Sequence, residues 1–282
     1  MMNEQESNKK VWLSLSYGDK MKLGASTACF YPLETEQALK KVCALGFEKA
    51  EVFMNAPSEL EEPFAKQLDK IARDGGVDII SVHPFSSFLE SSCIFGDYQR
   101  RFNDYIGLYQ KTCHCAAVLG AKFVVIHGAV AMPKIPIPDE RYFERFKMLV
   151  DIGRAEGVTV CQENVNRFKS QTIDFCKKMR NALGNDYNMV FDIKQTVRAN
   201  QDTFVFLEEF KHQIRHLHIS DNSSLGDCLP PGKGEFDFLK LKKIMDDAHY
   251  DGDAVIEIYS GGYDVAKELK ESKVYLDKLW TK

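Results

Sequence analysis

The sequence lacks any CxxC pair, although eight cysteines are spread over its 282 residues. Residues 1–20 also lack an apolar stretch long enough for a signal peptide or a membrane span. Without an export signal, the cysteines are most simply reduced thiols. We therefore expect a cytoplasmic protein that does not partner with a membrane, and we interpret residues 1–20 as a flexible N-terminal extension.

One short segment, Cys113-His114-Cys115, combines cysteine and histidine as some metal sites do. It lies in a stretch with a helical pattern, where side chains two positions apart point about 200° away from one another. The two thiols therefore cannot hold one ion together. We predict that both cysteines pack between helices.

An excess of basic residues is missing too, since the net charge is −4 and the pI is about 6.0. Proteins that bind duplex nucleic acid usually present a basic surface, so the composition argues against nucleic acid as a partner. No glycine-rich phosphate loop follows the first apolar run, because Ala25-Ser26-Thr27-Ala28-Cys29 does not match GxGxxG. A dinucleotide-binding fold therefore loses its main support.

Short apolar, β-branched runs alternate with longer amphipathic segments from residue 21 onward. Buried runs separated by helices indicate a parallel sheet with crossover connections, and eight repeats favour its closure. We predict an α/β fold in which residues 21–282 form a single (β/α)8 TIM barrel. The predicted strands are Lys22–Thr27, Ala50–Phe53, Asp78–His83, Phe123–His127, Thr159–Glu163, Met189–Asp192, His216–Ile219 and Ala254–Ile258. The predicted helices are Glu34–Ala44, Pro63–Arg73, Arg101–Leu119, Glu140–Glu156, Thr172–Leu183, Thr203–Phe210, Phe238–Ala248 and Asp264–Leu279.

Ionisable side chains recur at the ends of these predicted strands. A charged residue within an apolar strand must be paired, bound to a metal or solvated in a cleft. The carboxyl ends of all strands in a parallel barrel meet on one face, where such folds place their active sites. Packing explains one buried histidine well, but it does not explain the whole set. Seven of the eight strands contain or end in such a residue: Glu51, His83, His127, Glu163, Asp192, His218 and Glu257.

The last four of these residues, Glu163, Asp192, His218 and Glu257, form a candidate metal site. Carboxylate oxygens with one imidazole suit Mn²⁺, Mg²⁺ or Co²⁺, and Zn²⁺ is an alternative. A cation also offsets the repulsion between three crowded carboxylates. We therefore expect one divalent metal ion as the cofactor.

Six short motifs follow one another along the chain: Val125-Ile126-His127-Gly128, Gln162-Glu163-Asn164, Phe191-Asp192-Ile193, His216-Leu217-His218-Ile219-Ser220-Asp221, Pro231-Gly232-Lys233-Gly234-Glu235-Phe236-Asp237 and Ile256-Glu257. In this order they resemble the xylose isomerase-like barrel superfamily, which contains sugar isomerases, sugar epimerases and enzymes of the endonuclease IV type. The resemblance runs from Met21 to the C-terminus. It implies that Glu163, Asp192, His218 and Glu257 bind one catalytic metal, and that dimers or tetramers form.

The resemblance also implies a metal-dependent isomerase or epimerase that acts on a small-molecule sugar or sugar phosphate. A proton α to a carbonyl becomes removable when a metal polarises the carbonyl oxygen and stabilises the enediolate. We predict Glu163 and Glu257 as the acid/base pair. They epimerise one carbon if they act on it from opposite faces, and they isomerise an aldose if the proton returns to the next carbon. Alternatively, both glutamates are ligands only, and a water or Lys194 is the base.

Other polar residues near this face are predicted to bind substrate. His83 and His127 are expected to contact hydroxyl groups, with a second metal or a packing role as alternatives. Glu51 is expected to bind a hydroxyl, and Lys194 and Lys233 are expected to clamp a phosphate or carboxylate.

Two motif residues and one turn are given supporting roles. His216 points the same way as His218 but lies deeper in the barrel, and Asp221 orients either His218 or the following loop. The Pro231–Gly234 turn lets the backbone approach closely, either to cover a substrate or to make a tight turn.

Three other functions stay open at this point. An endonuclease IV-like phosphodiesterase acting on abasic DNA needs further histidines for a three-metal cluster, and this chain has Gln195 and Cys228 where that branch has two of them. A polyol dehydratase uses the same proton abstraction, so the sequence does not separate it from an isomerase. A non-catalytic binding protein is disfavoured, because it has no need of two opposed carboxylates.

Overall fold

The computed structural model describes residues 21–85, 87–133, 136–259 and 263–280. Eight parallel strands close into one barrel in the order β1-β10-β7-β6-β5-β4-β3-β2. The predicted (β/α)8 barrel is thereby confirmed, whereas the extension predicted for residues 1–20 lies outside the described residues. The barrel strands are β1 (Leu23–Ser26), β2 (Lys49–Phe53), β3 (Asp78–His83), β4 (Phe123–Ile126), β5 (Thr159–Glu163), β6 (Met189–Asp192), β7 (Ile214–Ile219) and β10 (Ala254–Ile256); β8 (Asp221–Ser223) and β9 (Gly226–Leu229) form a separate antiparallel hairpin.

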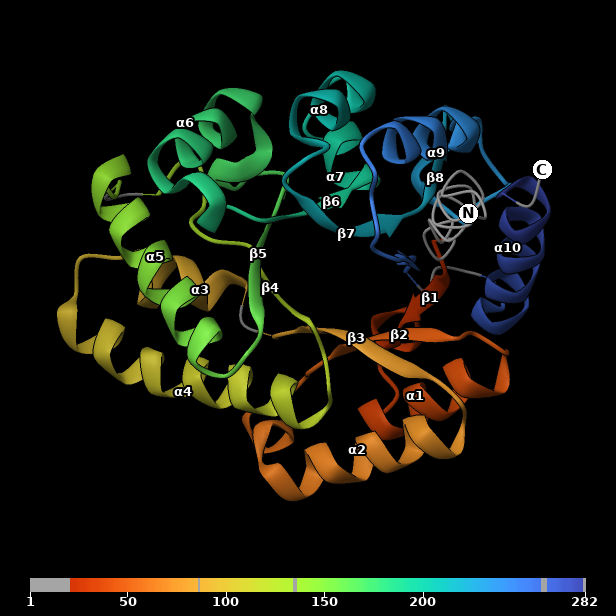
Figure 1. Cartoon of the computed structure of the whole chain (residues 1–282), viewed down its shortest axis with the longest axis horizontal. Helices are drawn as coiled ribbons and strands as arrows, with labels where there is room; N and C mark the ends of the chain where they lie inside the picture. The colour runs from red at the N-terminus through yellow and green to blue at the C-terminus, as the bar shows by residue number, and fades with distance from the viewer. Residues whose placement is uncertain (1–20, 86, 134–135, 260–262, 281–282) are drawn as a thin grey trace, which may run out of the picture.

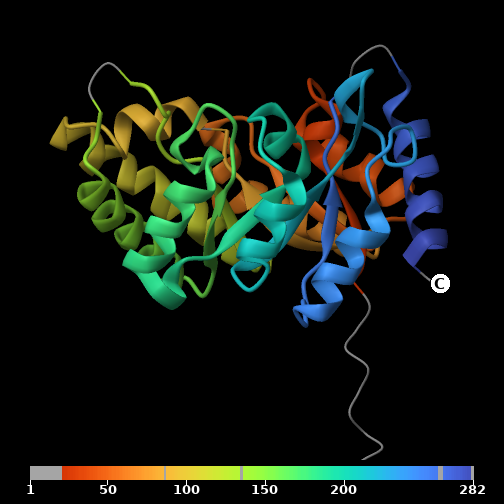
Figure 2. The ribbon, with the colours of Figure 1, turned by 90° about the horizontal axis from the view of Figure 1, so that it is seen from above.

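Helices form an outer ring around the strands (Figure 1) and flank them when the molecule is seen from above (Figure 2). All eight predicted helices are present, and no helix in the described ranges is long and apolar enough to cross a membrane. The sequence pattern does not predict α3 and α7, because elements this short do not display a helical period. The helices are α1 (Thr35–Ala44), α2 (Glu62–Asp74), α3 (Ser87–Cys93), α4 (Gln99–Val118), α5 (Asp139–Ala155), α6 (Ile173–Leu183), α7 (Ile193–Arg198), α8 (Thr203–Phe210), α9 (Phe238–Asp247) and α10 (Val265–Trp280).

The barrel has two separate apolar regions, because alternate side chains of a strand point to opposite sides of the sheet. Outward side chains pack beneath the helices in one large cluster. Within the described chain, the second buried cluster is small and contains Val125, Cys161 and Val190. Two positions further along β5 and β6, the same face carries Glu163 and Asp192. The barrel interior is therefore apolar at this small cluster and polar toward the carboxyl ends of the strands.

The Cys113-His114-Cys115 segment lies within α4. Cys113 and Cys115 are buried, whereas the His114 side chain is half-exposed and its Nδ1 lies 3.0 Å from Glu156 Oε2. The cysteines and the histidine therefore face different surroundings. Both cysteines belong to the main buried apolar cluster, which agrees with the packing role predicted for them.

A buried carboxylate organises the loop that follows the β8–β9 hairpin. Asp221 accepts four backbone hydrogen bonds of 2.8–3.0 Å, at Oδ1 from Asn222 and Phe236 and at Oδ2 from Gly232 and Gly234. A Cβ atom at position 234 would lie 2.4 Å from Asp221 Oδ1, so only glycine fits there. The close approach predicted for this turn is thus real, and its partner is Asp221. Of the two roles predicted for Asp221, the structure supports the one that orients the loop.

We expect Asp221→Asn to lower the free energy of unfolding by about 2–4 kcal/mol, since an amide NH₂ replaces one oxygen and leaves two backbone N–H groups without an acceptor. Urea titration followed by circular dichroism measures the change. Asp237→Asn is the matched control, because Asp237 Oδ1 caps α9 by accepting from Lys240 N and asparagine caps helices equally well. Equal stability of the two variants would contradict the role of Asp221.

Candidate active site

The ionisable residues predicted at the strand ends meet at one face of the barrel. Strands β3, β5 and β6 end at His83, Glu163 and Asp192, and His127 and Glu257 directly follow β4 and β10. A cavity of about 370 Å³ opens among them, a size typical of small-molecule sites. A larger hollow of about 830 Å³ lies outside the barrel, over α4 and α5, and contains none of these residues. The smaller cavity is lined by Ala28, Tyr31, Phe53, Asn55, His83, His127, Glu163, Gln195, Glu257 and Tyr259.

The four predicted metal ligands form a compact cluster beside this cavity. His218 Nδ1 lies 3.3 Å from Glu257 Oε2, 3.7 Å from Asp192 Oδ2 and 3.8 Å from Glu163 Oε1. Asp192 and His218 are register partners on neighbouring strands. Asn164 holds the Asp192 backbone, accepting from its N–H at 2.7 Å and donating to its carbonyl at 3.0 Å. The fold therefore fixes the backbone from which these ligands project.

The donor atoms of this cluster fit a divalent cation. One atom from each of Glu163, Asp192, His218 and Glu257 lies within 4.8 Å of the others. His218 Nδ1 is buried and makes no hydrogen bond to any described part of the chain. A buried nitrogen that makes no hydrogen bond is costly unless something else binds it. Three carboxylate oxygens and one imidazole nitrogen are ligands that Mn²⁺, Mg²⁺, Co²⁺ or Zn²⁺ accepts.

Burial and counter-charges act against each other on these carboxyl groups. Burial by itself would raise the pKa of Glu163, but neighbouring imidazoles, led by that of His127, hold it well below its usual value. For Asp192 burial is the largest effect and raises the pKa, although the Lys194 ammonium opposes it. The cluster is therefore an anionic site whose counter-charges come from imidazoles and one lysine.

Lys194 lies inside this cluster and is not part of the cavity lining. Its side chain is 1% exposed, and its ammonium contacts Asp192 Oδ2 and Glu257 Oε2. Burial by itself would lower the pKa of the ammonium, but the two carboxylates hold it well above its usual value. The predicted role of Lys194 as a substrate clamp therefore competes with an existing contact, because its ammonium is already paired with two of the proposed metal ligands.

His83 and His127 both line the cavity and face one another, with their Nε2 atoms 2.9 Å apart. His127 Nε2 lies 2.8 Å from Glu163 Oε2, and His83 Nε2 lies 3.6 Å from the same oxygen. Their position suits the predicted contacts with substrate hydroxyl groups. Together with Glu163 they also form a second group of atoms close enough to hold a cation, so the predicted alternative of a second metal keeps its geometric basis.

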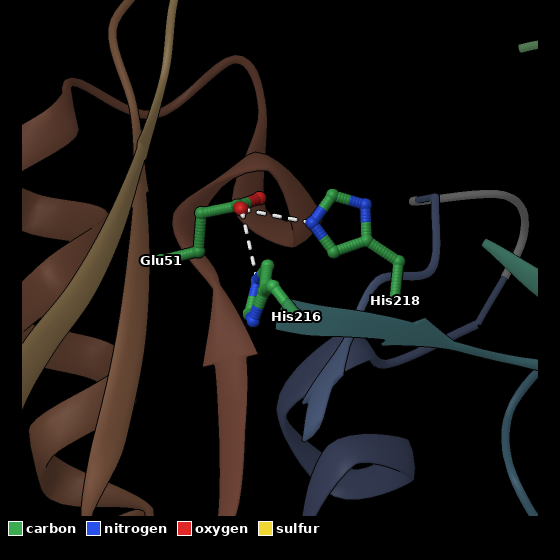
Figure 3. A group of neighbouring side chains, drawn as sticks. All are labelled: Glu51, His216 and His218. Atoms are coloured by element: carbon green, nitrogen blue, oxygen red, sulfur yellow. Dashed lines mark hydrogen bonds and ion pairs between the residues drawn. The ribbon is translucent and has the colours of Figure 1, made fainter. Parts of the chain in front are cut away.

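Glu51 and His216 lie below the cavity and contribute no atom to its lining. Figure 3 shows the Glu51 carboxylate reaching from β2 toward the imidazoles of His216 and His218 on β7. Burial by itself would raise the pKa of Glu51, but His218 and His216 hold it well below its usual value. The predicted hydroxyl contact of Glu51 has no support in this placement, because the side chain is fully buried and its oxygen atoms are bound to protein donors.

Lys233 does not join the cluster. Its side chain is 46% exposed, and its Nζ lies 2.7 Å from Glu271 Oε2 and 3.5 Å from Glu268 Oε2, both on α10. The structure therefore gives no support to the substrate clamp predicted for Lys233. An exposed lysine that pairs with two glutamates is an ordinary surface ion pair.

Several cavity residues escape the sequence argument. Phe53 and Tyr259 lie two positions beyond Glu51 and Glu257. Side chains two positions apart on a strand point to the same face, so this alternation is the sequence signal that could identify both residues. Tyr31 and Asn55 lie in loops after a short helix and a strand, where no period marks them. These side chains add apolar and amide surface to a site that the sequence presents as purely ionic.

The model of one protein family, described as the xylose isomerase-like TIM barrel, matches residues 39–279. The chain belongs to this family. The predicted resemblance is thereby confirmed over most of the chain.

The proteins and solved structures that are similar to this chain have diverse names. An uncharacterized Mycobacterium leprae protein, ML2432, is 23% identical and covers 88% of this chain and 92% of its own length. Inosose dehydratase of Clostridium botulinum is 24% identical, with 79% and 81% covered. The structure of D-psicose 3-epimerase with D-tagatose from Clostridium cellulolyticum H10 has a TM-score of 0.75 at 16% identity and covers 92% and 99% of the two chains. IOLI protein with a binding zinc atom gives the same TM-score, identity and coverage. At these identities the solved structures establish the shared fold.

Proposed function

We propose that this protein is a metal-dependent isomerase or epimerase of a small sugar or sugar phosphate. The observation that carries the proposal is the convergence of Glu163 and Glu257 on the cavity and on His218, from the ends of β5 and β10, which have two strands between them. Glu163, Asp192, His218 and Glu257 would hold one divalent ion. When bound, such an ion polarises a substrate carbonyl and acidifies the adjacent C–H bond.

Each glutamate has an atom in the cavity wall, where a substrate carbon can approach it. The low pKa of Glu163 keeps it ionised and able to accept a proton, and the pKa of Glu257 is lowered as well, because Lys194 and His218 outweigh its burial. One carboxylate removes the proton from the carbon and releases it to solvent, while the other takes up a proton from solvent and delivers it to the opposite side of that carbon. His83 and His127, which line the cavity, would hold the neighbouring hydroxyl groups, and the rings of Phe53 and Tyr259 would add apolar surface around the substrate.

The names of the relatives support this reaction class. D-psicose 3-epimerase, L-ribulose 3-epimerase and 3-keto-D-glucoside 4-epimerase share the fold, and inosose dehydratase is a sequence relative. An epimerase of a keto sugar and a dehydratase of a cyclic ketone both begin with loss of a proton α to a carbonyl. The phosphodiesterase alternative has less support, because Gln195 lines the cavity with an amide and the Cys228 thiol donates to the Glu257 carbonyl at 3.8 Å.

The test is exchange of substrate hydrogen with solvent. We expect the Mn²⁺-loaded protein to incorporate deuterium from ²H₂O at the carbon next to the carbonyl of a ketose, in a panel of D-fructose, D-psicose, D-tagatose, L-ribulose and their phosphates, detected by NMR. No incorporation in any member would overturn the proposal. Formation of an unsaturated product from an inosose would move the assignment to a dehydratase, and chelator-sensitive cleavage of an abasic DNA duplex would move it to a phosphodiesterase.

A further inference from the structure

The carboxylate of Glu51 is fully buried in the barrel interior and has no place in the reaction proposed above. It is 0% exposed and belongs to β2. Its Oε2 lies 2.8 Å from His218 Nε2 and 3.3 Å from His216 Nε2, and it accepts from Ser81 Oγ at 2.9 Å. Ser26 Oγ donates to the other oxygen at 3.3 Å. The interior thus places an ionised group directly behind one proposed metal ligand (Figure 3).

The strand register explains how this arrangement arises. Ser26 on β1 and Ser81 on β3 are the register partners of Glu51, so both hydroxyls stand beside it on the same face. The two histidines reach it from β7 on the other side of the barrel. Hydrogen bonds from opposite walls therefore fix the carboxylate in position and direction. A carboxylate buried at this depth is expensive unless donors surround it, and this one is surrounded.

The contact determines which nitrogen of His218 faces the carboxylate cluster. A carboxylate can only accept, so the Nε2 of His218 must carry the proton that Glu51 binds. In the neutral ring the lone pair then lies on Nδ1, and Nδ1 is the atom that stands 3.3–3.8 Å from Glu163, Asp192 and Glu257. A hydrogen-bonded carboxylate behind a metal-bound imidazole also makes that imidazole a stronger donor.

We propose that Glu51 is a positioning residue that fixes the ring of His218, and its Nε2–H tautomer, so that Nδ1 serves as a metal ligand. This inference rests on the metal site of the proposed function. His216 and Ser81, which are 3.2 Å apart, complete the support of the carboxylate from below. The role replaces the substrate contact expected for Glu51 from its place on a strand.

The test compares metal affinity in Glu51→Gln with that in Glu59→Gln. Glu59 is also a buried glutamate, but its partners are Thr35 Oγ1 and the Asn55 backbone, none of them a proposed ligand. We expect Glu51→Gln to weaken Mn²⁺ and Zn²⁺ binding, measured by titration calorimetry, by about 10- to 100-fold, the usual effect of removing such a partner. Glu59→Gln should bind as the wild type does. Because Gln keeps the shape of Glu51, circular dichroism should show both variants folded.

A second measurement does not depend on how the variant folds. In the wild-type protein labelled with ¹⁵N-histidine, we expect a downfield, slowly exchanging N–H resonance at Nε2 of His218, and in the Zn²⁺-loaded form the metal shift should appear at Nδ1. A metal shift at Nε2, or equal metal affinity of a folded Glu51→Gln variant and the wild type, would overturn the role of Glu51 alone. A wild-type protein that binds neither metal would instead overturn the proposed function.

Discussion

Replacing Glu257 with glutamine is expected to lower kcat by about 10²- to 10⁴-fold, which is the contribution that a positioned acid/base group makes. The amide cannot accept a proton, but its carbonyl oxygen can still approach a cation from the same place. Metal binding should therefore weaken far less than turnover falls. Steady-state kinetics on the ketose that shows the largest deuterium exchange, together with calorimetric titration of Mn²⁺, measure both effects.

The sugar that still exchanges hydrogen in each variant distinguishes a glutamate that carries protons from one that only binds the metal. With D-fructose and D-psicose, which differ only at C3, Glu257→Gln should still wash deuterium into one of the two sugars, because Glu163 can remove and return hydrogen on its own face. Glu163→Gln should show the opposite preference. Equal loss of exchange from both sugars in both variants would contradict the acid/base assignment and favour glutamates that act as ligands only.

A matched control for these kinetics is Glu209→Gln on α8. The Glu209 carboxylate pairs with Arg180 at 2.7 Å, outside the barrel and away from the cavity lining. It is a partly exposed ion pair, so its loss should change stability little and kinetics not at all. A large kinetic effect in this variant would show that turnover responds to general loss of stability.

The sequence predicts the barrel and its polar face because both depend on short periods. A strand alternates its side chains, so Glu163 and Asp192 must share the interior with Cys161 and Val190 two positions earlier. Parallel strands then bring their carboxyl ends to one face whatever the lengths of the helices between them. Those two rules are enough to place the proposed ligands near one another without any knowledge of the loops.

The same rules do not say what a strand residue touches across the barrel. Glu51 and His218 are separated by 167 positions, and their contact depends on closure of the sheet. Lys194 follows Asp192 by two positions, yet its ammonium turns back into the cluster because α7 begins immediately after β6. Predicted as groups that reach a substrate, both residues are instead buried among protein partners. Sequence reasoning identifies the polar interior but not its internal pairing.

The second large effect concerns the cation itself. His218→Ala removes the only nitrogen among the four proposed ligands and leaves Glu51 without its nearest histidine donor. We expect Mn²⁺ affinity to fall by about 100-fold or more, as loss of a ligand should exceed the loss of its supporting partner. Titration calorimetry after dialysis against chelator measures it. A His218→Ala protein that retains one tightly bound equivalent of metal would refute the ligand assignment.

Lys194→Met should change the affinity in the opposite direction. The ammonium of Lys194 contacts Asp192 Oδ2 and Glu257 Oε2, two oxygens that a metal would also use. Removing it leaves the carboxylates without that counter-charge, so the metal-free protein should be less stable and Mn²⁺ should bind about tenfold more tightly. The rise in Tm on adding Mn²⁺ should then exceed that of the wild type, since tighter binding to the folded state adds more stability at a given metal concentration.

Weaker binding in Lys194→Met would mean that the lysine supports the occupied site. Tighter binding would mean that lysine and metal compete for the same carboxylates, and that the side chain of Lys194 must move when the metal enters.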